Sequence, residues 1–220
     1  KGNVVSPDDL VRDYGCDALR MYELFVGPPE LDAEWDDRGI EGVARFLNRF
    51  YNLVMDSKDK DIKETKEMVK LRHKLVYDIE TRFNQFSLNT VVSGFMEYCN
   101  KLTDVAKKKG GIDKETLKTF VILLAPFTPH LGEELWRELG GTDSVFHATW
   151  PECDEEAMKD DEIEVAVQVN GKVKAVIMVP ADIAKEDAIA AGKAAVEGKI
   201  TGNIVKEIYV PKKIVNLVVK

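Results

Sequence analysis

Apolar side chains recur every three or four residues through most of the first 150 positions, which is the spacing of one face of an α-helix. The pattern predicts long amphipathic helices with short connections, packed as an all-α antiparallel bundle. Three stripes carry this prediction: Val43, Phe46, Leu47, Phe50, Tyr51 and Val54; Met68, Leu71, Leu75, Ile79 and Phe83; and Leu88, Val91, Val92, Phe95, Met96, Cys99 and Leu102.

Two shorter helices are predicted ahead of the bundle. Ser6-Pro7-Asp8-Asp9 combines a capping serine, a proline at the first helical position and acids in the first turn, and this helix should end at Gly15. The second helix, residues 16–25, should stop before the breaker Gly27-Pro28-Pro29. We assign residues 1–36 to a short helical segment and residues 37–150 to the bundle.

Two prolines interrupt the helical pattern late in the bundle. Proline in a helix interior costs roughly 3 kcal/mol, so Pro126 and Pro129 must end one helix, which Asp113 caps at its start, and begin another. Thr128 can be the N-cap of the new helix, with Pro129 at its first position. The inward face of that helix should carry Leu131, Leu135, Trp136 and Leu139.

The period changes from 3.6 to 2 after residue 162, which indicates β-strands. Alternating apolar residues on either side of Asn170-Gly171 predict a hairpin with a two-residue turn. A helix at 185–196 and strands at 204–210 and 214–219 complete a small α+β (ββαββ) C-terminal domain over residues 163–220. The acidic stretch 151–162 is the expected linker, which makes the chain multidomain.

Charge is unevenly distributed along the 220 residues. The formal net charge is −8, yet residues 56–111 hold 12 basic and 9 acidic side chains and residues 163–220 hold 9 and 6. Two basic regions in an acidic chain allow a polyanion to be bound locally. Arg45 and Arg49 lie one helical turn apart and are either a pair of phosphate ligands or a solvated or ion-paired flank of the helix.

No catalytic or metal-binding spacing is visible. Cys16, Cys99 and Cys153 are far apart, which argues against a zinc site or a disulfide framework. His73, His130 and His147 are equally scattered, and we expect structural roles for them. No apolar run approaches the roughly 20 residues that cross a bilayer, and the start is not a signal peptide, so a cytoplasmic location is expected.

Several motifs resemble the class I aminoacyl-tRNA synthetases of the Leu/Ile/Val/Met group, and within it the bacterial-type leucyl-tRNA synthetases. The resemblance covers nearly the whole chain. The start, Lys1 to Pro7, looks like the segment that directly follows the Lys-Met-Ser-Lys-Ser signature of that group. The other motifs are Tyr14-Gly15-Cys16-Asp17-Ala18-Leu19-Arg20, Gly27-Pro28-Pro29-Glu30, Arg45-Phe46-Leu47-Asn48-Arg49, Ala125-Pro126-Phe127-Thr128-Pro129-His130, Glu133-Glu134-Leu135-Trp136 and Val167-Gln168-Val169-Asn170-Gly171-Lys172.

The resemblance implies a C-terminal, anticodon-binding-type fragment of a ligase of protein biosynthesis that charges tRNA-Leu with leucine. The catalytic domain, which uses ATP and Mg²⁺, and the editing domain would lie elsewhere in the same chain. The fragment alone should be inactive, without a cofactor of its own, and monomeric. Charge, periodicity and family location together select these candidate tRNA-binding residues: Arg45, Arg49, Arg72, Lys74, Arg82, Lys172, Lys174, Lys212 and Lys213.

Three alternatives stay open at this point. The bundle and tail could form a non-catalytic protein-interaction scaffold, which the net charge favours slightly. The chain could be the equivalent region of another Leu/Ile/Val/Met-group synthetase, although paired zinc cysteines and a terminal heptad coiled coil are both missing from the sequence. A stand-alone hydrolase with a Cys/His pair has no supporting spacing.

Overall fold

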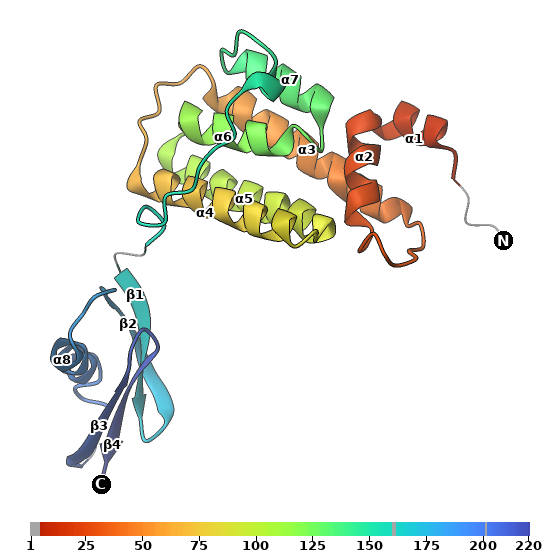
Figure 1. Cartoon of the computed structure of the whole chain (residues 1–220). Coiled ribbons are helices and arrows are strands. Elements are labelled where there is room, and N and C mark those ends of the chain that lie inside the picture. The colour runs from red at the N-terminus through yellow and green to blue at the C-terminus, as the bar shows by residue number, and fades with distance from the viewer. Residues whose placement is uncertain (1–4, 160–161, 201) are drawn as a thin grey trace. The chain divides into compact units, whose positions relative to one another are not determined.

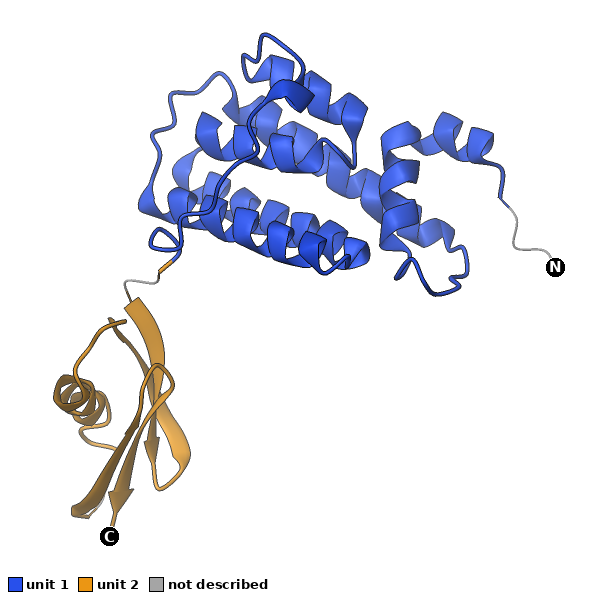
Figure 2. Cartoon of the chain, viewed as in Figure 1, with its two compact units in different colours: residues 1–158 blue, residues 159–220 orange. Residues whose placement is uncertain are grey.

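The computed structural model describes residues 5–159, 162–200 and 202–220 (Figure 1). The chain divides into two compact units, Lys1–Met158 and Lys159–Lys220 (Figure 2). The first unit is helical, and the second is a small mixed sheet with one helix. Of the synthetase-like segment Lys1 to Pro7, the first four residues lie outside the described residues.

The helices of the first unit confirm the predicted bundle. Residues with helix-capping side chains begin three of the helices: Asp36, Thr65 and Asp113 each accept a hydrogen bond from a backbone N–H in the first turn. The helices are α1 (Pro7–Tyr14), α2 (Cys16–Phe25), α3 (Asp37–Ser57), α4 (Lys66–Asn84), α5 (Leu88–Lys109), α6 (Lys114–Leu124) and α7 (Pro129–Glu138), followed by the 3₁₀ turn η1 (Val145–His147).

The core of this unit is aromatic at its centre. Phe50 of α3 stacks on Phe120 of α6 with 4.2 Å between ring centroids, and Phe95 of α5 lies 5.6 Å from Phe120. One predicted core residue is wrong, because Phe83 is 48% exposed. Each four-residue step along an α-helix rotates the side chain by about 40°, so Phe83 has turned about 80° away from the direction of Leu75.

At the proline corner, α6 ends at Leu124 and Pro129 is the first residue of α7, as predicted. Thr128 is the N-cap by position, but its hydroxyl donates to the Leu124 carbonyl (3.3 Å) and does not cap the new helix. The acceptor comes instead from α2, where an Asp17 carboxylate oxygen accepts a 2.7 Å hydrogen bond from the Leu131 N–H. Helix α7 is therefore capped by a residue 114 positions away.

Part of the acidic stretch predicted as a linker contacts α4. The Trp150 indole N–H donates to Glu80 (3.0 Å), and the Asp154 backbone N–H donates to Nδ1 of His73 (3.1 Å). Cys153 is half-buried, with its Sγ 3.6 Å from the His73 carbonyl oxygen. Residues 150–154 thus run along α4 as part of the helical unit.

The second unit is a four-stranded sheet in the order β2-β1-β4-β3 with α8 (Lys185–Ala195) packed on one face. Strands β1 and β2 pair antiparallel, as do β3 and β4, whereas β1 and β4 pair parallel. The Asn170-Gly171 turn has positive φ at both residues (50° and 80°), as a two-residue hairpin turn requires. The strands are β1 (Glu162–Val169), β2 (Lys172–Pro180), β3 (Ile204–Val210) and β4 (Ile214–Val219).

Candidate nucleic-acid interface

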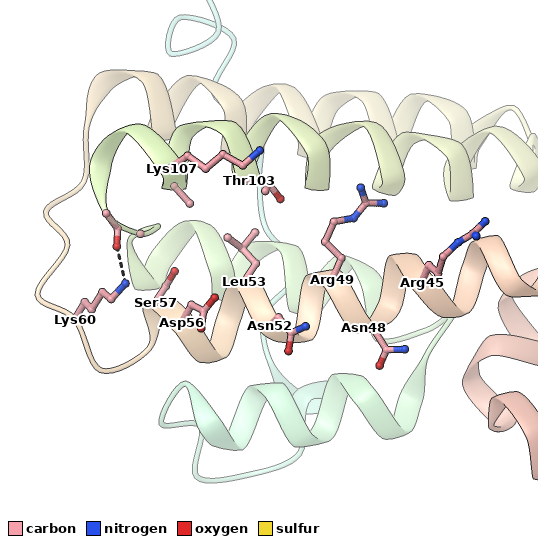
Figure 3. A pocket seen from close by; sticks show the side chains of 13 residues that line it. Arg45, Asn48, Arg49, Asn52, Leu53, Asp56, Ser57, Lys60, Thr103 and Lys107 are labelled. Carbon is pink, nitrogen blue, oxygen red and sulfur yellow. Dashed lines mark hydrogen bonds between the residues drawn. The ribbon is translucent and has the colours of Figure 1, made fainter.

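A groove of about 580 Å³ lies between α3 and the C-terminal half of α5 (Figure 3). Most of its lining residues are polar or charged, and basic side chains come from α3, from α5 and from the connection after α3. The lining residues are Arg45, Asn48, Arg49, Asn52, Leu53, Asp56, Ser57, Lys60, Thr103, Ala106, Lys107, Gly110 and Gly111.

Arg45 and Arg49 place two exposed positive charges on the α3 wall of the groove. The buried stripe of α3, which includes Phe46 and Phe50, fixes the rotation of the helix and leaves both arginines exposed. Their side chains extend toward α5 (Figure 3). Within the described ranges, neither guanidinium has an intramolecular hydrogen bond or ion pair. Each can therefore bind an anion without first breaking a contact of the fold.

The positive charge of Arg49 also affects a thiol on the neighbouring helix α5. Burial raises the pKa of the Cys99 thiol on α5 to about 11, and the positive charge of Arg49 opposes that rise. A cation that stabilises a thiolate must stand close to it. Arg49 therefore extends from α3 toward α5 (Figure 3).

At the opposite end of the groove, basic and acidic groups lie close together. Lys60 donates a 2.8 Å hydrogen bond from Nζ to the carbonyl oxygen of Gly110, just beyond α5, where the helix dipole is negative (Figure 3). Asp56 lines the same end, and Lys107 pairs with Asp104 at 3.1 Å in an exposed contact. Sequence patterns did not single out Lys60 or Lys107, because only the packing of α3 on α5 places them here.

Arg72 is largely enclosed by the bundle. Its side chain is 13% exposed, makes an ion pair with Glu64 and lies 3.9 Å from the carboxylate of Asp113. Asp113 is itself buried and caps α6 through the Thr116 N–H. Arg72 therefore connects α4 to the start of α6. Lys74, predicted beside it, is half-buried on α4.

Arg82 also lies within a packing contact. It donates a 2.6 Å hydrogen bond to the Thr90 carbonyl oxygen, and its guanidinium is 3.7 Å from Glu97. The side chain passes over Gly94, where an added Cβ would come within 2.4 Å of a guanidinium nitrogen. Gly94 thus leaves the space through which the Arg82 side chain crosses from α4 to α5.

The predicted lysines of the second unit are exposed and form two separate groups. Lys172 and Lys174 follow the Asn170-Gly171 turn. In the parallel pairing of β1 with β4, the Asn170 N–H donates to the Leu217 carbonyl near the end of β4. The Ala166 N–H donates to the carbonyl of Lys213, just before the start of β4. The second turn, with Lys212 and Lys213, therefore lies toward the opposite end of the strands.

The Cys/His hypothesis gains little from Cys153 and His73, which lie near each other. His73 Nδ1 already accepts the Asp154 N–H, and burial together with nearby carboxylates raises the pKa of the Cys153 thiol. A raised pKa disfavours the nucleophilic thiolate. In the part of the chain that the structure covers, no group of three His, Cys, Asp or Glu side chains could hold a metal ion.

The same residues contain no helix that combines the length and apolar character needed to cross a bilayer.

Comparison with known protein families matches a segment that runs from α4 through the rest of the helical unit into the second unit. Residues 65–189 match the model of the anticodon-binding domain of tRNA ligase, which is more than half of the chain. The chain belongs to this anticodon-binding family. The match includes α4 to α7 of the bundle and the α5 wall of the groove, whereas the α3 wall precedes the matched residues.

Relatives of this anticodon-binding chain include leucine–tRNA ligases from Fervidobacterium nodosum, 41% identical over 240 residues, and Petrotoga mobilis, 42% identical over 242 residues. Each alignment covers all of this chain and 29% of the relative, so the chain spans under a third of those proteins. The chain is also similar to LeuRS in the crystal structure of a ternary complex, LeuRS-tRNA-LeuAMS, from Agrobacterium radiobacter K84. That match has a TM-score of 0.76 and 27% identity, and covers 100% of this chain and 30% of the other. These matches confirm the resemblance to bacterial leucyl-tRNA synthetases.

Proposed function

We propose that the chain is the tRNA-docking part of a leucine–tRNA ligase and that the groove between α3 and α5 binds phosphates of tRNA-Leu. The observation that carries the proposal is the pair Arg45 and Arg49 on one wall of a groove, two exposed guanidinium groups with no partner among the described residues. Arginine forks match the geometry of phosphate oxygens, and such contacts position a nucleic acid without reading its sequence.

The remaining predicted cations fall into two groups in this proposal. Lys172, Lys174, Lys212 and Lys213 are exposed and supply further backbone contacts from the second unit. Arg72 and Arg82 mainly hold helices together, and the phosphate role first expected for them has less support because both guanidinium groups already contact the fold. We keep Lys74 as a weaker candidate contact.

The whole enzyme would carry out the ATP-dependent and Mg²⁺-dependent chemistry in its catalytic domain, and docking of tRNA here uses neither. We further propose the functional division 1–36, 37–150, 151–162 and 163–220, in which the start of the connecting stretch 151–162 packs on α4 and a ββαββ tail domain is the second tRNA contact. A monomer in the cytoplasm fits this role.

Fluorescence anisotropy with a leucine tRNA transcript tests the proposal. The chain should bind at low salt, and binding should weaken linearly on a log–log plot of affinity against salt. Each phosphate contact contributes roughly 0.7 to 0.9 to the magnitude of that slope. The variant Arg45→Gln/Arg49→Gln loses two contacts, so its slope should be smaller by about 1.4 to 1.8. The matched control is Arg12→Gln/Arg137→Gln, since both arginines are exposed and already paired with carboxylates outside the groove.

An equal slope for the groove variant and the wild type would refute the groove as the phosphate site. Absence of any tRNA complex at low salt would refute tRNA docking itself and favour the protein-interaction scaffold. Equal affinity for tRNA and for an unstructured RNA of the same length would contradict recognition by shape.

A further inference from the structure

The turn between α4 and α5 contains an aromatic residue in a conformation that normally favours glycine. Phe86 has φ = +54° and its residue is 64% exposed. Hydrogen bonds from Ser87 N to Arg82 O (3.0 Å) and from Phe86 N to Phe83 O (2.9 Å) form the pattern that ends a helix with one left-handed residue. Glycine occupies that position most often because it has no Cβ to strain.

Packing does not explain the phenylalanine. About two thirds of the residue is exposed, so the ring contributes little to the core. Its neighbour Phe83 is 48% exposed and contacts the bundle through an edge-to-face arrangement with Phe127, 6.5 Å between centroids. A strained backbone that displays an exposed aromatic ring points to a ligand for that ring.

The chemistry around the ring favours a nucleobase. Residues 83–89 contain no charged side chain, and the exposed amides of Asn84 and Gln85 have no hydrogen-bond partner among the residues that the structure describes. An apolar protein surface placed on Phe86 would leave these amides desolvated and unsatisfied. An unpaired base offers a π-face for the ring and hydrogen-bonding edges for the amides.

We propose that the α4–α5 turn is a stacking site for an unpaired RNA base, with Phe86 under the base and Asn84 and Gln85 at its edge. The site rests on the proposed docking of tRNA and adds a contact at the other end of α5 from the Lys60 and Gly110 end of the groove. It has no cation within the turn, so it contributes affinity through stacking and not through phosphate neutralisation.

Phe86→Gly separates the ligand role from a packing role, because the two roles predict different changes. Glycine relieves the left-handed strain, so the midpoint of thermal unfolding should be unchanged or higher. Affinity for the leucine tRNA transcript should fall about 5- to 150-fold, the range that loss of one base–aromatic stack produces. The slope of affinity against salt should stay the same, and Phe86→Trp should retain the affinity. The control Phe146→Ala removes another exposed ring, from η1 (53% exposed against 64% for Phe86), and should leave binding unchanged.

If Phe86→Gly binds tRNA with wild-type affinity while Arg45→Gln/Arg49→Gln binds weakly, the stacking site is overturned and tRNA docking stays intact. A lower unfolding midpoint in Phe86→Gly with unchanged affinity would show a packing role and overturn it equally. Self-association of the wild type that Phe86→Gly abolishes, again with unchanged affinity, would reveal a protein contact instead. If the wild type binds no tRNA, the proposed function fails and this site fails with it.

Discussion

The capping of α7 from α2 allows a quantitative prediction about stability. Asp17 is 11% exposed in its side chain, and its carboxylate accepts hydrogen bonds from the Leu131 N–H at 2.7 Å and from the His130 ring and backbone at 2.8 and 3.4 Å. Replacing Asp17 by alanine removes an anion from a helix N-terminus and leaves the α7 N–H groups without this acceptor.

The size of the effect follows from these contacts. A hydrogen bond to a charged group contributes about 1.5 to 3 kcal/mol, and a helix cap contributes about 0.5 to 2 kcal/mol. The two figures describe overlapping contacts, so we expect Asp17→Ala to lower the free energy of unfolding by about 2 to 3 kcal/mol. Asp17→Asn keeps an acceptor but loses the charge and should cost about 1 kcal/mol.

Urea unfolding of the chain, followed by circular dichroism at 222 nm, measures these differences. For a unit of this size the alanine variant should also melt about 4 to 12 °C lower. His130→Ala is the control, because it removes a largely exposed ring and leaves the backbone N–H groups capped, so it should cost well under 1 kcal/mol. A loss below about 0.5 kcal/mol for Asp17→Ala, or equal losses for the alanine and asparagine variants, would refute the reasoning.

Three further predictions concern other contacts. Arg72→Gln should lower the free energy of unfolding by about 2 to 4 kcal/mol, because the buried carboxylate of Asp113 loses its cation. The salt dependence of tRNA binding should stay unchanged. A smaller loss in urea unfolding would contradict the buried contact. Gly132→Ala should cost about 1 to 2 kcal/mol, since the new Cβ would lie 2.7 Å from a Cβ at the end of α6, whereas the control Gly42→Ala has open space and should be stabilising in the same assay. Asp143 raises the pKa of His147 above its usual 6.5, so the stability that this pair contributes is present at pH values below the unfolded pKa of His147 and is lost as pH rises through its folded pKa. In an NMR titration, the midpoint of His147 should fall toward 6.5 in Asp143→Asn. An unchanged midpoint would contradict the pairing.

Local patterns predicted the helices of the bundle well. Gly15, the proline corner and the capping residue Asp113 act within a few positions of their own helices, so their signals can be read from neighbouring residues. The inward face of α3 was predicted for the same reason, and with it the outward direction of Arg45 and Arg49. The side on which those arginines find a second wall could not be predicted, because α5 begins almost 40 residues later.

Contacts between distant residues account for what the sequence did not reveal. The cap from Asp17 to α7 leaves no mark in the α7 sequence, where Thr128 has the expected residue type for that role. Charge and spacing cannot distinguish Arg72, which is enclosed by Glu64 and Asp113, from an arginine that faces solvent. The acidic composition of residues 151–162 suggested a linker, yet the hydrogen bond from the Asp154 N–H to His73 of α4 holds the first part of this stretch against the helical unit.

The parallel pairing of β1 with β4 has a consequence for the order of folding. The two hairpins each join strands close in sequence and can form locally, but the β1–β4 ladder pairs Ala166 with Ile214 and Val169 with Leu217. That ladder must close a loop of nearly 50 residues before its hydrogen bonds repay the lost chain entropy. Helix α8 packs on Val167 and Val215 across this central ladder, with Gly192 close to both. The second unit should therefore gain its core in one late step, when the hairpins meet beneath α8.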